Sequence, residues 1–248
     1  DKKSLEECFD EASNQKVIEG INQLNQVKAN HLTLFDLEYP RKLKLRLGKH
    51  APPVLIVKGN LDLLRTKAVG FCGSRQASEK GIGIAKNCVK QLVDKEVTII
   101  SGYANGIDQT VHLEALKEGG STIIVLPEGI SYFKIKNAFK DYWDWDKVLV
   151  ISEFFPSDKW IVNRAMQRNS TIVALSDAMI LIEAKENGGS IDAGKKALKL
   201  NVPLFAPVYE GMPPFAKGNQ LLIANGAHEV YRDNNYQAKL SNLFEVLN

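Results

Sequence analysis

Cysteine is scarce in this chain of 248 residues, which contains only Cys8, Cys72 and Cys88. An odd number of widely spaced cysteines argues against a disulfide framework and favours a reducing compartment, with the thiols as small buried apolar side chains. Long hydrophobic runs are absent as well, because stretches such as residues 122–126 and 178–182 fall far short of the roughly 20 residues that a membrane span needs. No signal peptide is visible. We therefore expect a cytoplasmic protein without a membrane partner.

A strong excess of one charge is also lacking, as are catalytic motifs. Lysine and arginine total 32 against 29 acidic residues, so any basic surface must come from local clustering. The chain has no phosphate-binding P-loop and no Gly-x-Ser-x-Gly nucleophile elbow. His31, His50 and His228 are scattered, which predicts no metal site. With no catalytic residue, cofactor or metal indicated, we expect a binding protein and not an enzyme.

Two short motifs imitate known sites without completing them. His112 opens half of a zinc-deaminase signature, but the cysteine half is missing, so we expect His112 to pack in a helix near the first loops. Gly81 and Gly83 resemble the start of a dinucleotide fingerprint, but Lys86 stands where the last glycine belongs, and both glycines lie inside a predicted helix. We predict no nucleotide motif there.

Short apolar runs rich in β-branched residues alternate with helical patterns from residue 68 onward. This alternation predicts an α/β fold: a Rossmann-like, doubly wound, mostly parallel sheet with helices on both faces. The predicted strands lie near residues 68–72, 97–100, 122–126, 148–151, 178–183 and 202–206. The predicted helices lie near residues 79–94, 108–118, 135–143, 161–175, 191–200 and 218–225.

The first part of the chain has a different pattern. Residues 1–35 have apolar side chains at roughly helical spacing and predict one or two polar helices. Residues 54–57 predict one short strand before the alternating region. We therefore divide the chain into an N-terminal helical segment, residues 1–38, and a Rossmann domain, residues 39–248.

Three glycine-rich loops follow predicted strands and precede predicted helices. Ligands bind beyond the carboxyl ends of the strands in such sheets, where helix N-termini and backbone N–H groups attract anions. Arg75 is either a phosphate ligand or a surface ion-pair partner. Asp108 is either a helix cap or a ligand contact. Tyr103 is either a platform on which a base stacks or an exposed loop aromatic. The candidate residues are Gly73, Ser74, Arg75 and Ser78 in the first loop, Ser101, Gly102, Tyr103, Asn105, Gly106 and Asp108 in the second, and Gly188, Gly189 and Ser190 in the third.

A predicted helix carries Arg164, Arg168 and Asn169, with the two arginines one turn apart. Two arginines on one face either straddle phosphates along a strand or form a solvated face. An arginine in a crowded cleft needs a counter-charge, for which Glu153 is the candidate.

An ordered series of motifs from about Tyr39 to about Tyr231 resembles the DprA/Smf family of DNA-processing proteins. The most recognisable part is the second loop followed by His112 and Gly120-Ser-Thr-Ile. The other motifs follow in order: Tyr39-Pro40, Pro52-Pro53, Lys58-Gly59-Asn60, Gly73-Ser74-Arg75, Ser152-Glu153, Arg168-Asn169, Leu175-Ser176-Asp177, Gly189-Ser190 and Gly218-Asn219.

The resemblance implies a single-stranded DNA-binding protein that forms a homodimer and hands DNA to the RecA recombinase during DNA uptake and recombination. It also implies DNA-backbone contacts for Arg75 and Arg168, while Lys195 is a candidate from its position only. The chain departs from the family at Asn105 and Ser170, where the family usually has arginine. Two cationic contacts are missing there.

The alternative function belongs to a different class. The same SLOG-type superfamily contains nucleotide hydrolases and nucleotide sensors, and the loss of two arginines favours such a smaller ligand. The absence of a Pro-Gly-Gly-x-Gly-Thr-x-x-Glu motif counts against a hydrolase, since residues 187–190 have no suitably spaced glutamate. A protein-interaction subunit without either ligand is a third alternative.

Overall fold

A single nine-stranded sheet runs through the part of the chain that the computed structural model describes, residues 11–233 and 237–248. Its strand order is β1-β2-β6-β5-β4-β3-β7-β8-β9. β2 pairs antiparallel with both β1 and β6, and every other pairing is parallel. The strands are β1 (Asn30–Thr33), β2 (Val54–Gly59), β3 (Ala68–Gly73), β4 (Thr98–Ser101), β5 (Thr122–Leu126), β6 (Val148–Ser152), β7 (Ala178–Ile182), β8 (Leu204–Pro207) and β9 (His228–Val230).

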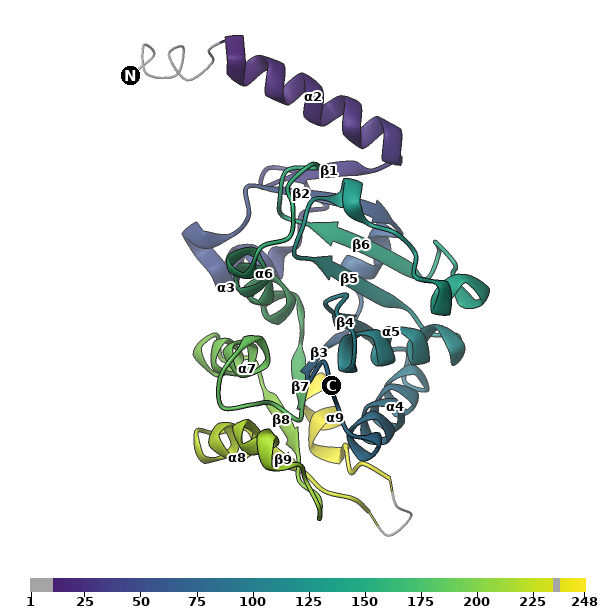
Figure 1. Ribbon diagram of the computed structural model, residues 1–248, viewed down its shortest axis with the longest axis vertical. Coiled ribbons are helices and arrows are strands. Elements are labelled where there is room, and N and C mark those ends of the chain that lie inside the picture. The colour runs from purple at the N-terminus through teal and green to yellow at the C-terminus, as the bar shows by residue number, and fades with distance from the viewer. Residues whose placement is uncertain (1–10, 234–236) are drawn as a thin grey trace.

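Helices cover both faces of this sheet (Figure 1). On one face α4 (Glu79–Val93), α5 (Ile107–Lys117) and α9 (Ser241–Leu247) bury a shared apolar core. On the other face α3 (Arg41–Leu47), α6 (Val162–Leu175), α7 (Gly189–Lys199) and α8 (Lys217–Ala224) bury another. The predicted doubly wound, mostly parallel fold is therefore confirmed.

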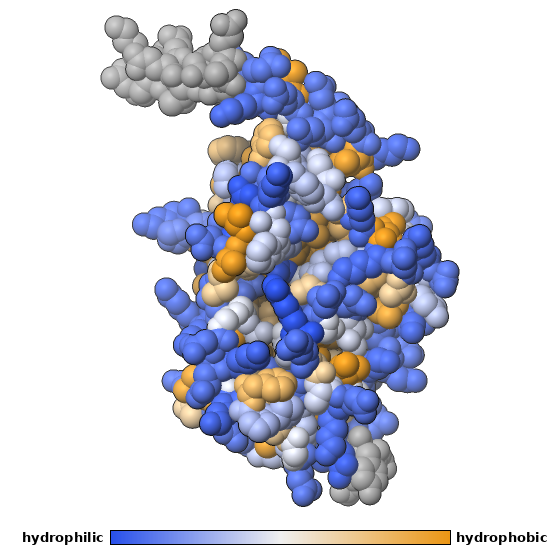
Figure 2. Space-filling model, in the orientation of Figure 1, coloured by the Kyte–Doolittle hydropathy of each residue, from blue (hydrophilic) through white to orange (hydrophobic). Residues whose placement is uncertain are grey.

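In the described part of the chain, the remaining helices are α2 and five short 3₁₀ turns. α2 (Glu11–Val27) lies at one end of the molecule, next to β1 (Figure 1). The 3₁₀ turns are Gly48–His50, Leu61–Arg65, Ile130–Tyr132, Asn137–Tyr142 and Pro214–Ala216. Within residues 11–233 and 237–248, no helix is long and apolar enough to cross a membrane. The surface in Figure 2 is accordingly mostly hydrophilic, with apolar side chains in scattered patches.

The structure corrects the sequence pattern at the two ends of the sheet. The helical prediction for residues 1–35 is wrong at residues 30–33, which form β1, where Leu32 pairs with Leu55 of β2. β9 is absent from the predicted strands, and the helix expected near residues 135–143 is a 3₁₀ turn. β1 and β9 are edge strands with mostly exposed residues, so they lack the continuous apolar run that marks the buried strands. Cys8 lies outside the described residues, and the boundary after residue 38 stays a prediction, although β1 precedes it and belongs to the main sheet.

The order of the strands reverses beside β3. The chain proceeds outward from β3 through β4 and β5 to β6, then crosses back through α6 to place β7 against the other side of β3. The close approach of this crossover requires Gly70, because a Cβ there would overlap Met179 Sδ and Ser176 Oγ. The loops after β3 and β7 therefore emerge side by side at the point where open α/β sheets bind ligands.

We predict that Gly70→Ala destabilises the protein by roughly 1–3 kcal/mol, the range for an overpacked core. Gly83→Ala in α4 is the matched control, because its Cβ would meet nothing within 4 Å. That change should be neutral or stabilising by up to about 1 kcal/mol, since alanine is the better helix former. Urea unfolding of both variants checks this, and equal stabilities would contradict the close packing at Gly70.

Candidate functional site

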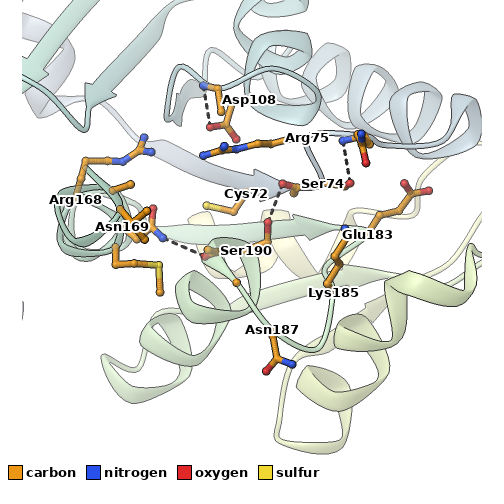
Figure 3. Close-up of a pocket in the computed structure, with 18 of the residues that line it drawn as sticks. Cys72, Ser74, Arg75, Asp108, Arg168, Asn169, Glu183, Lys185, Asn187 and Ser190 are labelled. Atoms are coloured by element: carbon orange, nitrogen blue, oxygen red, sulfur yellow. Dashed lines mark hydrogen bonds between the residues drawn. The ribbon is translucent and has the colours of Figure 1, made fainter. Parts of the chain in front are cut away.

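A pocket of about 530 Å³ lies at this reversal point. Its walls come from the loops that follow β3 and β7, from α6 and from the start of α5 (Figure 3). The structure brings together most of the predicted site residues from four separate segments. They are Gly73, Ser74 and Arg75 of the first loop, Asp108 of the second, Gly188, Gly189 and Ser190 of the third, and Arg168 and Asn169 of α6.

Arg168 is the buried cation of the pocket. Its side chain is only 6% exposed, its Nη1 donates a hydrogen bond to the Val125 carbonyl oxygen at 2.7 Å, and its buried Nε has no partner among the described residues. Figure 3 shows the guanidinium directed toward Asp108. An unpartnered buried donor costs free energy, so this N–H is a group that a ligand acceptor would satisfy.

Arg164 is not part of the pocket, although one turn of α6 separates it from Arg168. It forms an ion pair with Asp158 at 2.6 Å, and its Nη1 donates to the Lys159 carbonyl oxygen. The structure therefore does not bring the two arginines together in this pocket, because the loop before α6 supplies a carboxylate for Arg164.

Asp108 is the counter-charge of the arginines and not a helix cap. Gly106 occupies the N-cap position of α5, and the Asp108 carboxylate accepts a hydrogen bond from Ala104 N at 3.4 Å. Burial raises the pKa of Asp108, and the attraction of Arg168, the hydrogen bond from Ala104 N and the charge of Arg75 act against that rise. The expected pairing of Glu153 with an arginine is replaced by hydrogen bonds from Gln167 and Thr171.

Arg75 differs from Arg168 in being exposed. Its side chain extends across the pocket toward Asp108 (Figure 3), and it has no hydrogen bond or ion pair with any residue that the structure describes. Of the two alternatives for Arg75, a surface ion-pair partner or a ligand contact, the structure therefore favours the ligand contact.

Glu183 occupies the anion position at the start of α4. Its buried carboxylate accepts hydrogen bonds from Ser78 N at 2.7 Å, from Ser78 Oγ and from the Tyr209 hydroxyl. A helix N-terminus attracts negative charge, and here the chain supplies that charge itself. The predicted phosphate contact at Ser78 is thus taken by an internal carboxylate, and Ser78 does not line the pocket.

The second loop serves mainly to hold structure. Ser101 is fully buried and donates to the Phe71 carbonyl oxygen at 2.7 Å, and the Gly102 carbonyl oxygen bonds to His112 Nε2. Gly106, at φ +77°, packs its backbone so closely against the first loop that a Cβ would overlap the backbone of Arg75. These residues position the pocket wall without lining it.

Tyr103 and Asn105 also contact other residues of the chain and do not line the pocket. The ring of Tyr103 packs against Phe133 and Phe139, with centroids 5.4 and 5.6 Å apart, so the predicted exposed aromatic is wrong. Lys136 Nζ donates to the Tyr103 carbonyl oxygen at 2.9 Å and to Asn105 Oδ1 at 3.2 Å. The distant segment around Lys136 satisfies both residues, which a local pattern does not reveal.

The third loop leaves the N-terminus of α7 facing the pocket. Gly188 is the N-cap at φ +107° and provides no side-chain cap, and its two successors line the pocket with it. Ser190 Oγ donates to the Gly73 carbonyl oxygen at 2.7 Å, and Asn169 Nδ2 to the Gly189 carbonyl oxygen at 3.0 Å. These bonds join the third loop to the first loop and to α6.

Lys195 is exposed and lies outside the pocket, because α7 carries it away from the loop. The neighbouring Lys196 forms an ion pair with Asp192 at 2.8 Å. The cation that the structure adds to the pocket is Lys185, in the loop after β7, and Glu183 and Trp160 are further lining residues that the sequence analysis missed. Both Glu183 and Lys185 stand where a parallel strand ends, a position that could have revealed them.

His112 anchors the second loop as a neutral imidazole. It is fully buried between Gly102 O and Thr122 Oγ1, the latter 2.6 Å from Nδ1. Burial is the main reason why its pKa falls from 6.5 to about 4. The expected packing of His112 in a helix near the loops is confirmed.

We predict that His112 makes the protein less stable in mild acid. Its folded-state pKa lies below its unfolded value, so the unfolded chain binds the extra proton, and stability is lost as the pH falls from 6.5 toward about 4. The full effect is on the order of 3 kcal/mol. Denaturant unfolding at pH 7 and pH 5 should show a smaller loss for His112→Asn than for the unmodified protein, and equal losses would contradict a neutral buried imidazole.

Comparisons with known proteins agree with the fold. The family model described as "DNA recombination-mediator protein A" matches residues 30–241. The DNA processing protein DprA of Streptococcus pneumoniae is 35% identical over 179 residues, which are 71% of this chain and 63% of that protein. DprA of Bacillus subtilis is 29% identical over 206 residues, covering 82% of this chain and 68% of the relative. The chain thus spans less than two thirds of the pneumococcal protein.

Solved structures show the same relationship. The X-ray structure of Streptococcus pneumoniae DprA has a TM-score of 0.73 at 32% identity and covers 82% of this chain and 71% of that one. A Helicobacter pylori structure is titled for the single-stranded DNA binding mode of its DNA processing protein A. It has a TM-score of 0.70 at 23% identity, and the match covers 88% of this chain and 94% of that one. On the match of the family model and of these relatives, this chain belongs to the DNA recombination-mediator protein A family, the DprA/Smf family.

Proposed function

We propose that this chain binds single-stranded DNA at the pocket where the strand order reverses. The observation that carries the proposal is the meeting of three donors on one cavity. These are the exposed guanidinium of Arg75, the buried and partly unpartnered guanidinium of Arg168, and the uncapped N-terminus of α7. Guanidinium groups and helix N-termini are the donors that phosphate oxygens prefer.

The two carboxylates of the pocket do not oppose an anion, because both are already engaged. Glu183 faces the start of α4 and accepts three hydrogen bonds, and Asp108 balances the buried Arg168. Arg75 and Lys185 are exposed and free of carboxylate ion pairs among the described residues. The charge offered to a ligand is therefore positive despite the small net charge of the chain.

A single strand fits this arrangement better than a duplex. A pocket of about 530 Å³ is the size that takes a drug-sized ligand, and a flexible strand can place one nucleotide in it. The related Helicobacter pylori protein has a structure titled for single-stranded DNA binding, which supports the same ligand class here.

The remaining parts of the proposed function rest on family membership. We propose a homodimer that protects single-stranded DNA and loads the RecA recombinase in DNA uptake and recombination, in the cytoplasm. A molar mass of two chains by light scattering, and co-purification of purified RecA with the protein, are the direct measurements.

We predict that Arg75→Ala weakens binding to a single-stranded oligonucleotide roughly tenfold and lowers the slope of log affinity against log salt by about 0.7, because one phosphate contact is lost. Fluorescence anisotropy at two salt concentrations measures both quantities. Lys195→Ala is the matched control, since it removes an exposed cation outside the pocket and should change the affinity less than twofold. Arg168→Ala is unsuitable, because it would leave Asp108 buried without its counter-charge.

Three results would contradict the proposal. Equal effects of the two substitutions would remove Arg75 from the interface. Tighter binding of duplex than of single-stranded DNA would exclude the proposed ligand. Thermal stabilisation by a mononucleotide, with no effect of an oligonucleotide, would favour the nucleotide-sensing alternative.

A further inference from the structure

A second pocket, of about 630 Å³, lies between α4 and the ends of β8 and β9. Figure 1 shows these three elements in its lower half. α4 contributes Lys80, Gly83 and Asn87, and the segments after the two strands contribute Tyr209 and Tyr231. It opens at the carboxyl ends of parallel strands, as the switch-point pocket does. The function proposed above makes no use of it.

Gly83 of α4 is one of the residues that line this pocket. Gly81, two residues earlier, is closely packed, because a Cβ there would lie 2.6 Å from the Glu183 carboxylate. Gly83 has no such neighbour, and a Cβ there would meet nothing within 4 Å. A side chain at this position would fill space that the bare backbone leaves free.

One hydrogen-bonded pair separates the two pockets. Glu183 lines the switch-point pocket, Tyr209 lines the second pocket, and the Tyr209 hydroxyl donates to the Glu183 carboxylate. The two pockets also come close to each other near the start of α4, where Gln76 of the preceding loop lines the first and Lys80 of α4 lines the second. A ligand that is longer than one pocket can therefore occupy both along a single sheet edge.

The lining of the second pocket combines aromatic rings with basic groups. The ring of Tyr231 is half exposed, and its hydroxyl donates to Glu229, so its polar group is already satisfied. Among the described residues that line the pocket, Lys80 and Arg232 are the basic ones and Glu210 is the acidic one, and Lys80 Nζ donates to the Glu210 carbonyl oxygen at 3.1 Å. Aromatic rings for base stacking beside cations for phosphates are the features of sequence-tolerant single-strand binding.

We propose that the second pocket binds a further nucleotide of the same single strand, its base against Tyr209 or Tyr231 and its phosphate near Lys80. The proposal rests on the function assigned to the switch-point pocket and extends it. A strand bound at Arg75 continues past the Glu183–Tyr209 pair into the second pocket, so the binding site is longer than the first pocket alone.

The substitution Gly83→Phe, whose side chain would fill the second pocket, tests whether a nucleotide binds there. Anisotropy is measured with labelled oligothymidylates of about 4 and about 16 nucleotides, which bracket the usual lengths of such sites. Loss of one stacked base should weaken binding of the longer oligonucleotide roughly tenfold, and the shorter one should bind within twofold of the unmodified protein. Gly83→Ala is the control, because a single methyl group leaves most of the pocket empty.

Lys80→Ala provides a second variant on an exposed position and does not depend on the fold tolerating a phenylalanine. It should weaken binding of the longer oligonucleotide and lower its salt dependence, with the shorter one unaffected. Circular dichroism and the melting temperature of each variant confirm folding.

Clear outcomes would overturn the proposal. If both variants bind the longer oligonucleotide normally while Arg75→Ala does not, the second pocket is not a strand subsite and the proposed function stands. If Arg75→Ala also binds normally, the proposed function itself fails. Thermal stabilisation by a free mononucleotide that Gly83→Phe abolishes, with oligonucleotide affinity unchanged, would assign the pocket to a free nucleotide. A changed molar mass alone would assign it to contact between two copies.

Discussion

The site depends on the hydrogen bonds that the Glu183 carboxylate accepts at the N-terminus of α4. This carboxylate joins the end of β7 to the loop after β3 through Ser78, and it joins both to the segment after β8 through Tyr209. β3 and β7 are neighbours in the sheet but lie far apart in the sequence, so this contact fixes one half of the fold against the other. Arg75, which lines the pocket, stands only three residues before Ser78, so the bonds between Ser78 and Glu183 help to fix the loop that carries Arg75.

Internal carboxylates at an anion site have a clear physical role. Burying the guanidinium of Arg168 without a counter-charge would be strongly unfavourable, and Asp108 supplies that charge while leaving one N–H unpartnered. Glu183 similarly occupies a helix N-terminus that would otherwise hold unsatisfied donors. The chain thus neutralises its buried groups itself, while the exposed Arg75 and Lys185 have no carboxylate ion pair among the described residues.

Much of the fold followed from local patterns. Strands such as β5 and β7 are continuous apolar runs buried on both faces, and the helices between them have one apolar side, so their order along the chain implied right-handed crossovers and a parallel sheet. β1 and β9 escaped detection because these two edge strands are largely exposed, so they lack the continuous apolar run of the equally short but buried β4 and β8. Likewise, no local signal reveals that α6 returns the chain to the far side of β3.

For the site, the residue types and their places after the strands were enough to identify the three loops and, with the family motifs, Arg75 and Arg168. The tertiary structure alone decided which of these side chains share a cavity. In the folded protein Tyr103 packs in an aromatic cluster and Arg164 forms an ion pair with Asp158. Ser78 donates to Glu183, and Lys195 lies on α7 outside the pocket. The physical reason is that strand ends and glycine turns are local properties of the chain. The partner of a charged or aromatic side chain, in contrast, comes from whichever distant segment packs nearest to it.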